Sequence, residues 1–145
     1  MPDNTIFYFS EDVDYEFKDS LTNDLVLTQI AGIEKVSIDS LNYIFCSDPY
    51  LLELNMKYLE HDYFTDIISF ETSEEIGVLS GDIFISVDRA KENADLYKVS
   101  LEEEIKRLII HGLLHLIGYK DESDDEKLLM RKKEDYYLSL FPKDK

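Results

Sequence analysis

The segment from Ser100 to Gly118 constrains the fold most, because its pattern predicts a helix that has to be buried. Ser100 is a good helix N-cap with Glu103 three residues on, and the acids at 102–104 suit the positive end of a helix dipole. Apolar side chains then occupy more than one face of the helix: Ile105, Leu108, Ile109, Ile110, Leu113, Leu114, Leu116 and Ile117. Such a helix belongs in the middle of a domain, and Gly118 is expected to end it.

The rest of the chain alternates between strand and helix patterns. Strands are predicted at residues 4–9, 35–46, 66–71 and 81–87, and helices at 21–33, 48–59, 88–97 and 124–140. The two consecutive strands, 66–71 and 81–87, can pair as a hairpin. We therefore expect an α+β fold, with a mixed four-stranded sheet packed against about five helices.

Length and composition indicate one domain over residues 1–145, with a substantial core. A hydrophobic share of 44%, with ten tyrosines and eight phenylalanines, excludes a disordered acidic chain. Cys46 is the only cysteine, which excludes an intramolecular disulfide and a cysteine-built zinc knuckle. We interpret it as a small buried apolar group. No signal peptide or long apolar run is visible, so a cytoplasmic protein without a membrane partner is expected.

The net charge argues against general affinity for nucleic acid. The chain has 32 acidic and 15 basic residues and a formal charge of −17, whereas nucleic-acid binders usually present a basic face. Acidic residues concentrate at 11–24 and 121–126, and small basic clusters lie at 106–107 and 131–133. Acidic runs are usually solvated surface, so the overall charge does not decide what a single cleft binds.

Two of the three histidines, His111 and His115, lie four residues apart on the predicted buried helix. This spacing places both imidazoles on one face, one turn apart, where they can bind one metal ion. The alternative is a pair of core histidines hydrogen-bonded to neighbours. Gly118 and Asp121 follow at seven and ten residues after His111, which is metzincin-like spacing with aspartate as the third ligand. Two imidazoles and a carboxylate suit one catalytic Zn²⁺ per chain, with another divalent metal as the alternative, unless Asp121 belongs only to the acidic run.

The residue after the first histidine argues against one class of zinc enzyme. A zinc protease has its general-base glutamate there, but this chain has Gly112. Losing a general base typically costs ~10²–10⁴-fold in rate. A peptidase is therefore not expected.

The sequence His-Gly-Leu-Leu-His-Leu-Ile-Gly-Tyr at residues 111–119 resembles the signature of the bacterial YbeY family, metal-dependent endoribonucleases of rRNA maturation. Glu126 and Met130 match the end of that signature, and residues 54–70 and 81–86 are similar to two further family blocks. The resemblance implies a single-strand-specific endoribonuclease that matures the 3′ end of 16S rRNA and acts in ribosome quality control. It also implies rRNA, the small ribosomal subunit and an Era-type GTPase as partners, with no role for DNA.

Three departures from the family pattern bear on the site. The family's third histidine ligand is Asp121, its active-site arginine is Leu59, and its proline is Phe64. An arginine at position 59 would bind phosphate through two hydrogen bonds. Lys57 or His61 is the candidate to supply positive charge in its place. His61 taken alone, however, suits a surface position.

The predicted mechanism is hydrolysis of RNA phosphodiesters by zinc-activated water, with His111, His115 and Asp121 as metal ligands and catalytic residues. Asp66 is either an acceptor that orients a ligand or a turn residue. The general base is left unassigned. Two alternatives remain: a non-catalytic metal-binding factor associated with the ribosome, and a metal-dependent hydrolase of another substrate.

Overall fold

Four strands and five helices make up the described part of the chain, residues 5–60 and 65–142, in this computed structural model. In chain order they are β1 (Ile6–Glu11), α1 (Ser20–Ile33), β2 (Ser37–Cys46), α2 (Asp48–Leu59), β3 (Ile67–Glu71), β4 (Val78–Ser86), α3 (Val87–Tyr97), α4 (Leu101–Ile117) and α5 (Asp124–Leu138).

The strands form one mixed sheet in the order β1-β2-β4-β3. Strands β1, β2 and β4 run parallel, whereas β3 pairs antiparallel with β4 as the expected hairpin. The predicted α+β fold with a mixed four-stranded sheet is therefore confirmed.

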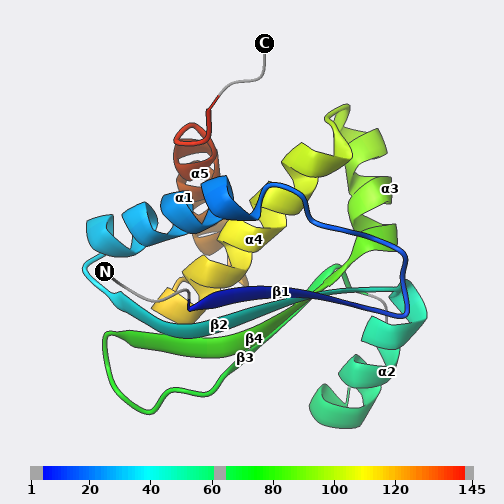
Figure 1. Ribbon diagram of the computed structural model, residues 1–145, viewed down its shortest axis with the longest axis horizontal. Coiled ribbons are helices and arrows are strands. Elements are labelled where there is room, and N and C mark those ends of the chain that lie inside the picture. Colours follow the sequence, from blue (N-terminus) through cyan, green and yellow to red (C-terminus); the bar gives the residue numbers. More distant parts are fainter. Residues whose placement is uncertain (1–4, 61–64, 143–145) are drawn as a thin grey trace.

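Helix α4 lies across one face of this sheet, between α1 and α5, and α2 lies on the other side (Figure 1). The predicted burial of α4 is confirmed, since Ile105, Ile109, Ile110, Leu113 and Leu114 are all fully buried. Their packing against β4 and β3 fixes the helix relative to the sheet, so the polar face of α4 is held in a defined direction.

The smaller apolar cluster on the other face forms beneath α2. It consists of Cys46, Leu51 and Ile68, with Tyr50 and Phe84 among the residues that pack around it. Cys46 is fully buried, as expected. Ser47 caps α2, accepting a hydrogen bond from the Tyr50 amide.

Some predicted boundaries were wrong. Strand β4 begins at Val78, three residues before the predicted start, because Gly81 lies inside the strand and does not begin it. A Cβ at Gly81 would come within 2.5 Å of the Phe70 carbonyl oxygen, so the close approach of β3 requires glycine. Strand β1 extends to Glu11, beyond the predicted end at residue 9, and α5 stops at Leu138.

None of the helices in the two described ranges has the length and apolarity needed to cross a membrane.

Candidate metal centre

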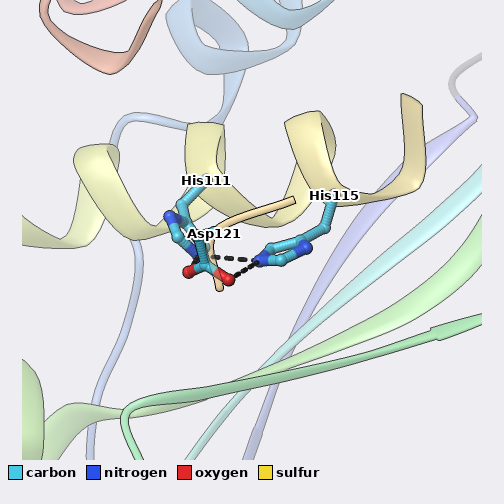
Figure 2. A group of neighbouring side chains, drawn as sticks. All are labelled: His111, His115 and Asp121. Atoms are coloured by element: carbon cyan, nitrogen blue, oxygen red, sulfur yellow. Dashed lines mark hydrogen bonds and ion pairs between the residues drawn. The ribbon is translucent and has the colours of Figure 1, made fainter. Parts of the chain in front are cut away.

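The side chains of His111, His115 and Asp121 converge on one point beside α4 (Figure 2). The two imidazole Nε2 atoms are 3.0 Å apart. The carboxylate of Asp121 places Oδ2 3.2 Å from Nε2 of His111 and Oδ1 3.5 Å from Nε2 of His115. One potential ligand atom from each residue lies within 4.8 Å of the other two, so all three can face a single ion.

A sharp turn at the end of α4 brings the carboxylate back to the histidines. Gly118 has a φ of +127°, and its amide bonds the carbonyls of Leu114 and His115. The Tyr119 amide also bonds the Leu114 carbonyl, which closes the turn. Asp121 then lies against both imidazoles, whereas residues 122–125 are exposed. The alternative interpretation, in which Asp121 belongs only to the solvated acidic run 121–126, therefore does not describe its position.

Hydrogen bonds hold the chain in place on both sides of Asp121. On one side, the Tyr119 hydroxyl donates to Oε1 of Glu34, which follows α1, over 2.8 Å. On the other, Ser123 and Glu126 form a reciprocal capping box at the start of α5. The position of Asp121 is therefore set by three helices, α1, α4 and α5.

Glu134 on α5 is the polar partner of His111, and it was not among the site residues predicted from the sequence. Its Oε2 lies 2.6 Å from Nδ1 of His111, and its Oε1 lies 2.9 Å from Nη1 of Arg107. Nη2 of Arg107 in turn donates to Asp135 over 2.8 Å. A carboxylate at Nδ1 holds the proton on that atom and leaves the Nε2 lone pair directed at Asp121 and His115.

A signal for Glu134 was present in the sequence. Met130, Glu134 and Tyr137 follow helical spacing and form the buried face of α5. An acid on the apolar face of a helix requires a partner in the interior. The stretch 131–135 is so rich in charge that this face is difficult to recognise before the helix is packed.

The two histidines differ in their electrostatic environment. Burial lowers the pKa of His111, but the Glu134 hydrogen bond and the nearby carboxylate charges together raise it by more, so the net direction is upward. Burial lowers the pKa of His115, and the adjacent His111 lowers it further. The adjacent carboxylates thus make His111 the more basic imidazole of the pair, and His115 the less basic one.

A cavity of about 370 Å³ lies in front of the three residues. Asp66 lines it and accepts a hydrogen bond from Asn93 over 3.1 Å, and Asn93 also donates to the buried Glu104. Burial raises the pKa of Glu104. Asp66 therefore lines the same cavity. The carboxylate that contacts the Nδ1 atom of His111, however, is that of Glu134.

Basic residues that line this cavity differ from those considered from the sequence. They are Arg107 and Arg131, one from each small basic cluster. Lys57 lies near the Tyr58 ring on α2 and, like the half-exposed Leu59, is not part of the described lining. His61 and Phe64 fall outside the described residues.

Gly112 faces the sheet while its neighbour His111 faces the cavity. A Cβ at this position would lie 2.8 Å from Cγ2 of Ile83 and 3.2 Å from Cδ1 of Ile67. The helix therefore packs too closely on β4 and β3 to accept a glutamate here.

Three comparisons with known proteins agree with one another. The model of the family described as Endoribonuclease YbeY matches residues 9–141. A relative named endoribonuclease YbeY from Cytophaga hutchinsonii is 52% identical over 97% of this chain and 98% of its own length. One from Flavobacterium psychrophilum is 49% identical over 92% of this chain and 94% of its own.

A solved structure has the same fold. The solution structure of TM1509 from Thermotoga maritima superposes with a TM-score of 0.63 at 28% identity, covering 93% of this chain and 87% of that one. The resemblance noted in the sequence is thus confirmed over nearly the whole chain, and this chain belongs to the endoribonuclease YbeY family.

Proposed function

We propose that this protein is a metal-dependent endoribonuclease that hydrolyses phosphodiester bonds of single-stranded RNA, with Zn²⁺ held by His111, His115 and Asp121. The convergence of these three side chains at the wall of a cavity is the observation that carries the proposal. Membership of the endoribonuclease YbeY family supplies the reaction class.

The donor set fits zinc. Two imidazole nitrogens and one carboxylate oxygen are ligands that zinc accepts, and three protein ligands leave a fourth position for substrate or water. When bound, a zinc ion supplies Lewis acidity for a water nucleophile and for a phosphoryl oxygen. An aspartate as third ligand adds negative charge, so the ion should be a weaker Lewis acid than with a third histidine.

The surrounding residues have distinct roles in this proposal. Glu134 holds the proton of His111 at Nδ1, so that Nε2 is free to bind the ion. The Tyr119 hydrogen bond to Glu34 holds the loop that positions Asp121. Arg107 forms an ion pair with Oε1 of Glu134 at 2.9 Å, which offsets the cost of burying that side chain beside His111.

The finer biological role is proposed from family membership. It comprises maturation of the 3′ end of 16S rRNA and ribosome quality control in the cytoplasm, by a single domain that works with the small ribosomal subunit and an Era-type GTPase. The family name fits an RNA substrate of this kind.

The test combines metal content with cleavage of a single-stranded RNA that carries the 3′ end of small-subunit rRNA. Asp121→Ala should lower bound zinc and reduce cleavage by about 10²-fold or more, because one of three ligands is lost. The adjacent exposed substitution Glu122→Ala is the matched control and should leave both unchanged. Asp121→His should keep both bound zinc and cleavage, since histidine supplies a nitrogen ligand in place of the carboxylate. Equal cleavage by wild type, Asp121→Ala and chelator-treated protein would contradict the proposal.

One alternative is a metal-binding factor that associates with the ribosome without cleaving RNA. Two observations favour it: the chain has Leu59 where the family has arginine, and its net charge is −17. That alternative predicts stoichiometric zinc and ribosome binding, but wild-type cleavage no faster than His115→Ala. Cleavage of other substrates, with RNA left intact, would instead support a different metal-dependent hydrolase.

A further inference from the structure

Arg107 and Arg131 are the two arginines in the described lining of the metal cavity, and they differ in availability. The Arg107 side chain is 14% exposed and binds both Glu134 and Asp135 at 2.9 Å or less. The Arg131 side chain is 50% exposed, and its contact with Glu134 is long, at 3.8 Å. Arg131 is therefore the cation of this cavity that can accept an external anion.

The guanidinium of Arg131 lies over the ring of Tyr97. The Cζ atom of Arg131 lies 5.5 Å from the centre of the Tyr97 ring, and Tyr97 lines the same cavity. Tyr97 ends α3 and Arg131 belongs to α5, so the contact joins two helices that both pack against α4. A guanidinium held against an aromatic face still presents its N–H edge to a ligand.

These two side chains match the chemistry of an RNA strand. The N–H edge of arginine binds phosphate through paired hydrogen bonds, and an exposed tyrosine ring offers a surface on which a base stacks. A duplex keeps its bases stacked on each other, whereas an unpaired strand presents base faces and phosphates together. A positive group is also needed here, because Asp66, Glu104 and Asp121 would otherwise repel a phosphate.

We propose that Arg131 and Tyr97 bind the RNA next to the metal centre, Arg131 through a phosphate and Tyr97 by stacking with a base. This inference rests on the proposed endoribonuclease function and names residues that bind its substrate. The pair supplies from α3 and α5 the phosphate contact that Leu59 on α2 does not provide. It also gives a physical basis for a preference for single strands.

The test uses Arg131→Gln and Tyr97→Leu in the full chain loaded with zinc. The matched controls are Lys132→Gln, which removes an adjacent exposed charge on α5, and Tyr136→Leu, which replaces an exposed tyrosine of the same helix. Neither control residue is in the described cavity lining. Cleavage kinetics and fluorescence-anisotropy binding are measured with a short single-stranded RNA and with the same sequence in a duplex.

Arg131→Gln and Tyr97→Leu should each raise KM and the dissociation constant for the single strand about 10-fold, with kcat changed less than about threefold. Arg131→Gln should also reduce the slope of log affinity against log salt by about 0.7, the value for one phosphate contact on a single strand. Arg131→Lys keeps the charge but loses the planar fork, so its effect should be intermediate. The controls should remain within about twofold of wild type.

This inference is overturned if each variant binds the single-stranded RNA as tightly as its control does, even when wild type cleaves RNA normally. The pairs to compare are Arg131→Gln with Lys132→Gln and Tyr97→Leu with Tyr136→Leu. If wild type binds but does not cleave the strand, the proposed function fails, and the binding comparison still decides the role of the pair. Thermal unfolding of each variant separates lost contacts from lost folding.

Discussion

His111 and Glu134 lie 23 residues apart in the chain, yet Nδ1 of the imidazole is 2.6 Å from Oε2 of the carboxylate. The contact joins α4 to α5 and fixes the ring that faces Asp121 and His115. Because Glu134 is buried and also binds Arg107, it has little freedom to move away. The geometry of the metal centre therefore depends on how these two helices pack.

Glu134→Gln should weaken zinc binding by about 10- to 100-fold, the usual effect of losing the carboxylate behind a histidine ligand. The neutral amide no longer favours the proton on Nδ1, and the ring loses its fixed orientation. Competition with a chromogenic chelator measures the affinity. Asp135→Asn is the control, because it removes a carboxylate from the same Arg107 without touching the imidazole. Equal zinc affinity in the two variants would show that Glu134 does not orient His111.

Gly112→Ala should lower the free energy of unfolding by about 1–3 kcal/mol, the usual cost of overpacking a core. The added methyl group would lie 2.8 Å from Cγ2 of Ile83, which is fully buried. Urea denaturation measures the loss. In the double variant with Ile83→Ala, the total loss should be smaller than the sum of the single losses, because the new methyl group fills space that Ile83 vacates. A stabilised single variant would mean that α4 and the sheet are not in close contact at this point.

The parts of the site that could be predicted are those encoded within a few turns of one helix. His111, His115, Gly118 and Asp121 span 11 residues, so the periodicity of a helix and the conformational freedom of one glycine are enough to bring them together. The burial of α4 followed in the same way, from apolar residues on several of its faces. Local spacing determines these relationships before any packing is known.

The contacts that were not predicted depend on packing between distant elements. Glu134 and Arg131 belong to a charged stretch whose inner and outer faces are distinguished only when α5 lies on α4. Tyr97 reaches the site only because α3 returns alongside α4. The start of β4 was also missed, since Gly81 has the local character of a turn but is required by the approach of β3.

Gly118→Ala should lower the free energy of unfolding by about 1–2 kcal/mol and weaken zinc binding, because alanine rarely adopts a φ of +127°. Nothing lies within 4 Å of the position of its Cβ, so the effect would be one of backbone conformation rather than steric overlap. Gly32→Ala provides the contrast. It also has free space, but it lies within α1 at a negative φ, where alanine should stabilise the helix by up to about 1 kcal/mol. Losses of the same size in both variants would contradict a role for the turn conformation.

Glu34 connects the acid stability of the fold to the loop of the metal centre. Partial burial raises the pKa of Glu34, but hydrogen bonds from Tyr137, Tyr119 and Lys133 lower it by more, so its pKa in the folded state is below the ordinary value. A carboxyl group of this kind stabilises the fold at pH values above its unfolded pKa, which is about 4.3. This stability is lost as the pH falls through the folded pKa.

Glu34→Gln should therefore be less stable than wild type at pH 7, by about 2 kcal/mol for hydrogen bonds to a charged group, and the difference should shrink below about pH 4. Urea denaturation between pH 3 and 8 measures this difference. The exposed substitution Glu122→Gln should give almost none at any pH. A constant difference between wild type and Glu34→Gln would show that side-chain shape, and not the ionised carboxylate, holds Tyr119. Zinc affinity at pH 7 should also fall in Glu34→Gln, because Tyr119 anchors the turn that carries Asp121 to the histidines.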